Sequence, residues 1–237
     1  MNRVELVKQE LKGYIDDEKA AFLPRFFKAF KGGYGEGDQF LGIVVPLQRK
    51  VARKYYKKIS LEEIESLLKE PVHEYRLTAL LMLVNKFEKA TDEPERKAIV
   101  DTYLNNLESV NNWDLVDLSA PNILGAFLFD KDKSILYKMA RTPDLWKQRI
   151  AILSTFYFIK QGRYDDTLKI TEILLTHVHD LIQKAVGWML REIGKRDFRV
   201  EYDFLKLNYR IMPRTMLRYA IERFESELRQ KFLKGLI

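Results

Sequence analysis

Apolar residues recur at steps of three and four along almost the whole chain, and there is no convincing run of strict apolar–polar alternation. This period places apolar side chains on one face of a helix, so it predicts an all-α protein. We take residues 1–237 as a single domain. Helices are predicted over residues 2–14, 18–30, 46–58, 61–69, 72–89, 93–108, 112–129, 133–140, 144–161, 165–176, 180–195, 198–208 and 213–234.

Several residues mark where these helices begin or break. Ser60 followed by Glu63 predicts a capping box, because the hydroxyl and the carboxylate can each bond an exposed backbone N–H. Asp144 is a candidate helix cap. Pro121 predicts a kink or a split within helix 112–129, since it removes a helical hydrogen bond. First-turn positions, where a missing N–H is tolerated, are predicted for Pro46, Pro71, Pro94 and Pro213.

Residues 32–38 form the one strongly non-helical segment and hold four of the 11 glycines. One interpretation is a loop that cradles phosphate. A nucleotide-binding loop of that kind follows a strand, whereas predicted helices flank this segment on both sides. The pattern therefore favours a flexible connector.

A weak internal repeat runs through the chain. Segments beginning at Arg76, Trp113, Arg149 and Lys184 follow one another at steps of 37, 36 and 35 residues. Each begins the second half of a predicted helix pair, and repeated pairs of this length are typical of a HEAT- or TPR-like solenoid. Equivalent helices of a solenoid line one concave surface. The repeat thus predicts basic and aromatic residues along a single groove.

Charge and composition narrow the chemistry. The chain has 41 Lys+Arg against 34 Asp+Glu, a formal charge of +7, which weakly favours a polyanionic partner. It has no cysteine, so disulfides, zinc–thiolate sites and thiol nucleophiles are excluded. The three histidines lack the spacing of a zinc-protease helix. We expect neither a metal nor an organic cofactor.

The sequence shows no targeting or membrane segment. Residues 1–14 are interrupted by charges and lack the apolar core of a signal peptide. No stretch reaches the roughly 18 apolar residues that a membrane-spanning helix needs. We expect a soluble, cytoplasmic and nucleoid-associated protein, monomeric and without an obligate protein partner.

Trp113 and Asp117 are the most informative pair. They are four residues apart and share one helix face. An indole beside a carboxylate is suited to hold a cation, because the ring face and the negative charge both attract it. The alternative is that Trp113 belongs to the core and Asp117 is a solvated or capping residue.

A second aromatic position lies on helix 180–195. Lys184, Trp188 and Arg191 share one face, and a basic stripe with an aromatic ring in it suits a nucleic-acid backbone. Gly187 allows something to approach the backbone closely. The alternative is that Trp188 is a core residue.

Three further arginines are candidate phosphate ligands. Arg149 directly precedes an apolar run, and it can either reach a phosphate bidentately or form a salt bridge between helices. Arg214 and Arg218 share a face at a helix start, which suits a phosphate, although a solvated charged face is the alternative.

Several of these motifs resemble the AlkD family of DNA alkylation repair proteins. The resemblance runs from about residue 18 to residue 224, in the same order and at similar spacings. It implies HEAT-like repeats curved around duplex DNA, and release of positively charged N3- and N7-alkylated purines without flipping the lesion into a pocket. It is carried by Phe40-Leu41-Gly42-Ile43 with Pro46, Trp113-Asp114-x-x-Asp117, Trp146-x-Gln148-Arg149-x-Ala151, Gln183-Lys184-Ala185-x-Gly187-Trp188-x-Leu190-Arg191-Glu192 and Arg214-Thr215-x-x-Arg218-Tyr219-Ala220.

The resemblance also assigns roles. The family's active-site Trp–Asp pair corresponds to Trp113 and Asp117, its arginine to Arg149 and its second cleft tryptophan to Trp188. The N-terminal aromatic that lines the cleft in some relatives has three candidates, Phe26, Phe27 and Tyr34. We expect affinity for double-stranded DNA without sequence preference from Lys184, Arg191, Arg214, Arg218 and Arg76.

Two other functions compete with a glycosylase. A non-catalytic solenoid that binds duplex or distorted DNA would keep the basic groove but would not need Trp113 and Asp117. A protein-binding scaffold, a common use of helical repeats, would show no affinity for duplex DNA.

Overall fold

Residues 2–237 are described by a computed structural model, and they form helices and no strand. One isolated bridge pairs Gln39 with Val72. The all-α prediction is therefore confirmed. Among the helices of residues 2–237, none is both long and apolar enough to cross a membrane. The chain divides into two units, one ending at Phe127 and the other beginning at Leu128.

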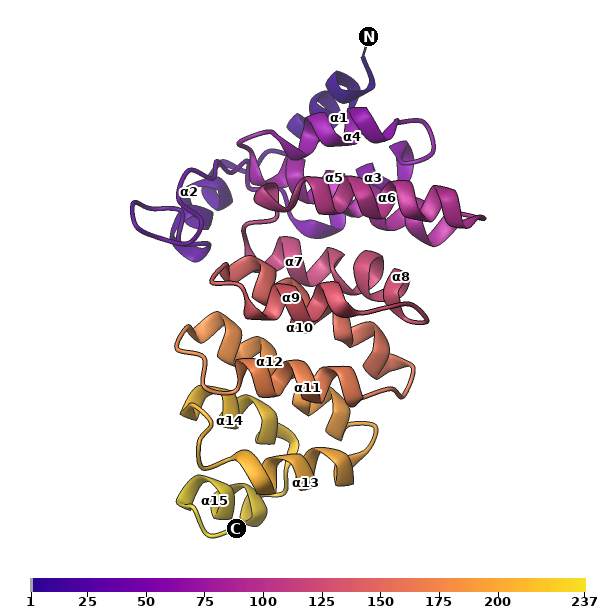
Figure 1. Cartoon of the computed structure of the whole chain (residues 1–237). Helices are drawn as coiled ribbons and strands as arrows, with labels where there is room; N and C mark the ends of the chain where they lie inside the picture. Colours follow the sequence, from indigo (N-terminus) through magenta and orange to yellow (C-terminus); the bar gives the residue numbers. More distant parts are fainter. Residues whose placement is uncertain (1) are drawn as a thin grey trace. The chain divides into compact units, whose positions relative to one another are not determined.

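The first unit stacks its helices in two layers (Figure 1). In one layer α5 packs between α3 and α7, and in the other α4 packs beside α1 and α6. Helix α5 is buried along most of its length, with Leu77, Leu80 and Leu83 in the core. The helices are α1 (Arg3–Lys12), α2 (Asp17–Phe26), α3 (Val45–Tyr55), α4 (Leu61–Leu68), α5 (His73–Lys89), α6 (Glu93–Asn105) and α7 (Trp113–Ser119).

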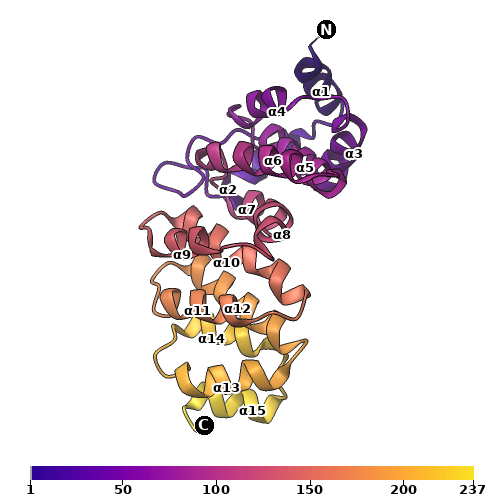
Figure 2. The same cartoon turned by 45° about the vertical axis from the view of Figure 1, so that its right-hand side comes forward.

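The second unit consists of helix pairs stacked one on the next (Figure 2). The second helix of each pair packs against the second helix of its neighbour, which places α12 between α10 and α14. This is the stacking expected of HEAT-like repeats, in which each pair buries the apolar face of the next. The helices are α9 (Ser134–Arg141), α10 (Leu145–Lys160), α11 (Asp165–Leu174), α12 (Asp180–Gly194), α13 (Phe198–Asn208), α14 (Arg214–Ala220) and α15 (Ser226–Lys234).

Most of the predicted start and break signals are confirmed, and Pro46 and Pro94 lie in the first turns of α3 and α6. The first-turn prediction is wrong for Pro213, which is the cap of α14, and for Pro71, which precedes Val72, the cap of α5. Proline is tolerated at these positions as well, because no helical hydrogen bond needs its missing N–H there.

The Ser60 hydroxyl accepts the Glu63 N–H at 3.2 Å, and the Glu63 carboxylate accepts the Ser60 N–H at 2.9 Å. Asp144 caps α10 by accepting two backbone N–H groups. Pro121 follows the end of α7 and begins a wider π-helical turn that leads into α8 (Ala126–Leu128).

Helix 213–234, predicted as one element, is two. Helix α14 ends at Ala220, and after a short 3₁₀ turn the backbone becomes extended at Phe224. Phe224 is buried against Phe198 and Phe232, with ring centroids 5.1 and 5.6 Å apart. The sequence has neither glycine nor proline there, so the break comes from burying this ring and not from a local signal.

Helix α2 is also shorter than predicted, because it ends at Phe26 instead of residue 30. Lys28 has a positive φ of 49°, which turns the chain out of the helix. Gly33 then lies directly against the Lys28 carbonyl, where a Cβ would come within 2.0 Å of the oxygen. The close return of the glycine segment therefore requires the helix to stop.

Gly187 lies at a close contact between α12 and α14. A Cβ on Gly187 would lie 2.4 Å from the Met216 carbonyl oxygen and 2.5 Å from the Tyr219 Cβ. The predicted close approach to Gly187 is thus made by a neighbouring helix of the protein.

Replacing Gly187 with alanine is expected to destabilise the protein by about 1–3 kcal/mol, because backbone atoms of α14 would have to move. Urea unfolding followed by circular dichroism measures this loss. Gly162→Ala is a suitable comparison for steric crowding, since nothing lies within 4 Å of its added Cβ, although its positive φ adds strain of its own. An unchanged midpoint for Gly187→Ala would contradict the packing argument.

Candidate active site and nucleic-acid interface

Helix α7 presents the predicted Trp113–Asp117 pair. Asn112 is buried and caps the helix, with its side-chain oxygen accepting the Trp113 N–H at 2.9 Å. Trp113 and Asp117 are both half-buried, whereas Leu115 and Ser119 are fully buried. The shared face of Trp113 and Asp117 is therefore the side of α7 that remains partly open to solvent.

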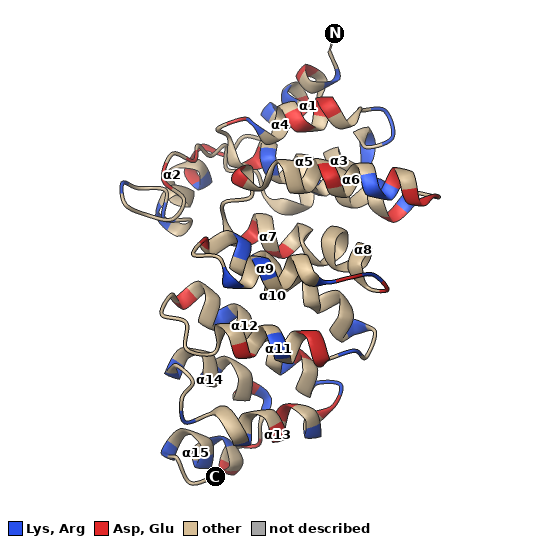
Figure 3. Ribbon diagram, in the orientation of Figure 1, with Lys and Arg blue, Asp and Glu red and all other residues tan. Residues whose placement is uncertain are grey.

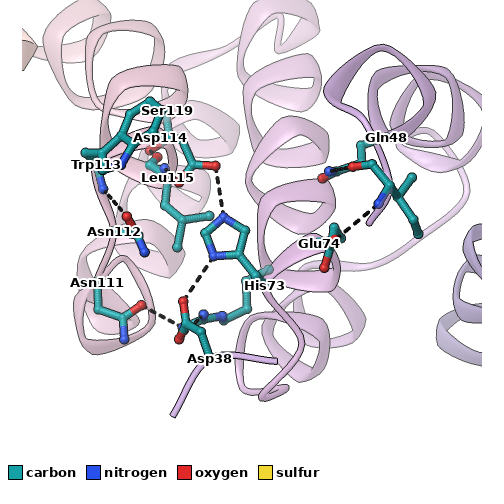
Figure 4. A network of polar contacts seen from close by, with 12 residues as sticks. Asp38, Gln48, His73, Glu74, Asn111, Asn112, Trp113, Asp114, Leu115 and Ser119 are labelled. Atoms are coloured by element: carbon teal, nitrogen blue, oxygen red, sulfur yellow. Dashed lines mark hydrogen bonds and ion pairs between the residues drawn. The ribbon is translucent and has the colours of Figure 1, made fainter. Parts of the chain in front are cut away.

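A buried network of charges surrounds the start of α7 (Figure 4). His73 Nε2 lies 2.9 Å from Asp114 Oδ2, and His73 Nδ1 lies 3.1 Å from Asp38 Oδ2. Arg76 pairs with the other Asp38 oxygen at 2.5 Å and donates to the Asn111 side-chain oxygen at 2.6 Å. These contacts run from Asn111, two residues before α7, through Arg76, Asp38 and His73 to Asp114 in the first turn of α7.

Interactions within this network shift the pKa values of His73 and Asp38. Burial lowers the pKa of His73, but attraction to Asp114 and Asp38 outweighs it and raises the pKa to about 9. Burial raises the pKa of Asp38, but its bonds to His73 and Arg76 outweigh burial and lower that pKa below its ordinary value. At neutral pH, His73 is therefore an imidazolium that donates from both ring nitrogens.

The aromatic candidates from the N-terminal segment occupy different places. Phe27 stacks on Trp113 with ring centroids 5.4 Å apart, and Phe26 meets the same indole edge-on at 5.8 Å. The Tyr34 ring lies beneath the Lys28 ammonium, at 5.3 Å from its centroid. Phe26 and Phe27 are therefore the N-terminal aromatics that share a site with Trp113.

Phe27 connects Trp113 to the charged network. The Phe27 ring also stacks on His73, with ring centroids 4.7 Å apart, and on Phe40, with ring centroids 5.3 Å apart. A cationic imidazole against an aromatic face is an attractive arrangement. The indole of Trp113 is thus tied to His73 through one intervening ring.

The glycine segment is a connector, as the pattern favoured, and it packs tightly against the site. A Cβ on Gly35 would lie 2.5 Å from the Phe27 carbonyl oxygen and 3.0 Å from the Asn112 side-chain nitrogen. The segment ends on Asp38, and Gln39 then bonds the backbone at both Pro71 and His73. Its glycines allow a close approach that delivers Asp38 to the network.

A cavity of about 320 Å³ lies beside the network, among α2, residues 42–46, α3 and α5. Its walls are mainly apolar and include Leu23, Phe27 and Ile43. His73 and Asp114 also border it. The charged network is thus set against an apolar surrounding, which strengthens the interactions between its charges.

In the second unit, Trp188 and Arg149 both have partners within the protein. The Trp188 indole N–H donates to Glu192 at 3.2 Å, and its half-buried ring lies 5.6 Å from the Phe156 ring. Arg149 is 5% exposed and donates to the Leu181 carbonyl at 2.6 Å. Arg149 therefore links α10 to the first turn of α12 through a backbone carbonyl.

The other predicted cations of this unit lie on α12 and α14 (Figure 3). Lys184 pairs with Asp180 on its own helix at 2.8 Å, and Arg191 pairs with Glu222. Arg214 and Arg218 are exposed at the surface of α14, and Arg214 donates to the Leu233 carbonyl. Arg218 is therefore the most open of this set to an external anion.

Arg76 needs a correction. The sequence places it with the DNA-binding cations, but its side chain is buried and is shared between Asp38 and Asn111. A phosphate could reach it only by displacing a buried carboxylate, which would leave that charge uncompensated. We therefore remove Arg76 from the DNA-binding set.

The sequence also left three residues of the site without a role. These residues are His73, Asp114 and Asp38. One local signal was available, because His73 and Arg76 are three residues apart and so share a helix face. Nothing in the sequence indicates that Asp38 and Asp114 lie opposite them.

Comparisons with known proteins decide the family. The model of the family described as DNA alkylation repair enzyme matches residues 7–224. The chain belongs to the DNA alkylation repair enzyme family. The resemblance to the family seen in the sequence is therefore confirmed. A comparison with curated protein sequences found no match.

Solved structures confirm that this family member has the HEAT-like fold. A predicted DNA alkylation repair enzyme from Enterococcus faecalis is 19% identical, with a TM-score of 0.70, and the match covers 90% of this chain and 97% of that one. AlkD2 from Streptococcus mutans is 17% identical, with a TM-score of 0.55 over 89% of this chain and 99% of that one. The protein smu.31 from Streptococcus mutans is 17% identical, with a TM-score of 0.53 over 88% and 98%.

Proposed function

We propose that this family member is a DNA glycosylase that releases positively charged N3- and N7-alkylated purines from duplex DNA. The observation that carries the proposal is the partly open Trp113–Asp117 face of α7, whose first turn is fixed by a buried network. Membership of the DNA alkylation repair enzyme family supports DNA as the substrate.

The main requirement of this reaction is that the protein stabilise the positive charge that develops on the sugar. Alkylation at N3 or N7 makes the purine cationic, so the base leaves without being protonated. As the glycosidic bond breaks, its electron pair neutralises the base, and positive charge grows on the sugar. Water adds to the sugar carbon and gives its proton to Asp117 or to solvent, which leaves a free base and an abasic site.

Each predicted residue has a distinct part in this reaction. The Asp117 carboxylate stabilises the cationic sugar and orients the water. The indole rings of Trp113 and Trp188 attract the cationic nucleotide. Arg149 acts as a positioning residue for α12, which carries Trp188. Lys184, Arg191, Arg214 and Arg218 contact backbone phosphates.

The test is to incubate the purified chain with duplex DNA that carries 7-methylguanine and to measure free base by mass spectrometry. We expect 7-methylguanine in solution and an equal amount of abasic sites, and no guanine from the unmodified duplex. No release with salt-sensitive binding intact would favour the non-catalytic DNA-binding function. Neither release nor binding would favour the protein scaffold.

Binding to duplex DNA is expected to depend steeply on salt, and Arg218→Ala should reduce that dependence. Removing one phosphate contact lowers the slope of log K against log salt by about 0.9. Fluorescence anisotropy with unmodified duplex at several salt concentrations measures the slope. The matched control is Arg199→Ala on α13, an exposed arginine that pairs with Asp203 and should leave the slope unchanged. Equal slopes for both variants would remove Arg218 from the DNA-binding set.

A further inference from the structure

We propose that His73 is a positioning residue for base release. By bonding Asp38 and Asp114 together, it sets the rotation of α7 and thereby the placement of Trp113 and Asp117. The catalytic part of this inference rests on the proposed glycosylase function, whereas its structural part does not.

Helix α7 needs such an anchor because it is short. It has seven residues, from Trp113 to Ser119, and the turn after it is widened at Pro121. A helix of two turns has little stability of its own, so its orientation depends on tertiary contacts. Its rotation about its own axis is therefore set by whichever side chains are held from outside.

Asp114 is well placed to set that rotation. At about 100° per residue, Asp114 lies roughly 100° from Trp113 and 60° from Asp117 around the helix axis. Asp114 is 6% exposed, and its carboxylate bonds His73 with one oxygen and its neighbour's N–H with the other. Holding Asp114 inward leaves Trp113 and Asp117 on the adjoining, partly open side.

His73 also reaches Trp113 by a second route. Phe27 lies between them, stacked on the imidazole at 4.7 Å and on the indole at 5.4 Å. The His73 side chain thus contacts α7 through Asp114 and contacts the Trp113 indole through Phe27. Both contacts depend on where the His73 ring lies.

Histidine suits this position because of its two donors. Asp38 and Asp114 come from segments on opposite sides of α5 in the sequence, and the protonated ring donates to each. With Arg76 the network has two positive and two negative charges, so the buried charges balance. Removal of His73 would leave two buried carboxylates sharing one arginine, and they would repel each other.

His73 acts through its neighbours and does not touch the substrate. Its side chain is 3% exposed, and both ring nitrogens are occupied by carboxylates. Its effect should therefore appear as a displaced Trp113 and as slower base release, with DNA affinity retained.

The experiment labels the full chain with 5-fluorotryptophan and records ¹⁹F NMR spectra. The three tryptophans, Trp113, Trp146 and Trp188, give three signals that single Trp→Phe variants assign. We expect His73→Gln to shift or broaden the Trp113 signal and to leave the Trp188 signal in place. A general loss of stability would not change the Trp113 signal alone.

The same variant is assayed on duplex DNA with 7-methylguanine. Misplacing a reacting group by about 1 Å costs on the order of 100-fold in rate, so we expect a fall of that size in single-turnover release with an unchanged Kd. The matched control is His177→Gln in the second unit, which should change neither the Trp113 signal nor the rate. A folded His73→Gln protein whose Trp113 signal coincides with that of the wild type would overturn the inference.

A second measurement covers the case in which His73→Gln does not fold. The wild-type Trp113 signal and the His73 ring protons are followed together as the pH rises while circular dichroism confirms the fold. A Trp113 signal that moves with deprotonation of His73 supports positioning, and one that stays constant through it overturns the inference. If the wild type releases no base, the proposed function fails, but the ¹⁹F spectra still decide the role of His73.

Discussion

Asp117→Asn is expected to slow the release of alkylated purines strongly while leaving binding to duplex DNA unchanged or slightly tighter. Asparagine has nearly the same shape, but it lacks the negative charge that would stabilise the sugar cation. Removing one group that stabilises transition-state charge costs roughly 100- to 1000-fold in rate. Single-turnover release of 7-methylguanine measures the loss, and anisotropy with the same duplex measures the affinity.

The control for this variant is Asp101→Asn on α6. Asp101 is an exposed carboxylate of the same unit that pairs with Lys97, so its neutralisation should change neither rate nor affinity. Asp117 also lies close enough to Tyr103 to contribute, after burial, to the raised pKa of that phenol. Thermal unfolding of both variants therefore accompanies the assay. Wild-type rates from a folded Asp117→Asn protein would remove Asp117 from the mechanism.

The stability of the chain is expected to fall as the pH rises from about 6.5 to 9, because in that range the unfolded chain releases the His73 proton that the folded protein still holds. The imidazole has an ordinary pKa of 6.5, and the folded protein raises it to about 9. A raised pKa means that the stabilisation is fully present below pH 6.5 and is lost as the pH passes the folded value. The shift corresponds to on the order of 3 kcal/mol.

Urea unfolding at a series of pH values measures this dependence, and two variants assign it. Glu201 in the second unit also contributes, because burial raises its pKa to about 8 despite the nearby Arg191, and its ionisation therefore destabilises the folded state as the pH rises through that value. The His73 share is the difference between wild type and His73→Gln, and the Glu201 share is the difference from Glu201→Gln. Equal pH dependence in wild type and His73→Gln would contradict a charged His73.

The predictions for Asp117 and for His73 concern the partly open and the buried side of the same helix, α7. In the proposed reaction, the half-buried Asp117 acts on the substrate, whereas the buried Asp114 three residues earlier bonds His73 inside the protein. The proposals thus give the two carboxylates of the Trp113-Asp114-x-x-Asp117 motif different parts, on adjoining sides of one short helix.

Local sequence patterns were sufficient to predict most of the helices. Apolar periodicity predicted the helices of both units, because a helix must bury one face whatever it packs against. The capping box at Ser60 and the break at Pro121 also follow from backbone chemistry within a few residues. Backbone chemistry within a few residues does not predict the break near Phe224 or the early end of α2. The break results from burial of the Phe224 ring against other aromatic rings, and α2 ends early because the glycine segment returns against it.

The order and types of residues are enough to predict the all-α class, the repeat of helix pairs, the family motifs and the shared face of Trp113 and Asp117. Which charges are buried depends on the folded arrangement of distant segments. Asp38, His73 and Asp114 are separated by 35 and 41 residues, and no local period relates them. The structure also shows that Arg76 and Arg149 bond partners inside the protein. The environment of a long cationic side chain depends on the partners that folding brings to it, so the sequence does not predict these bonds.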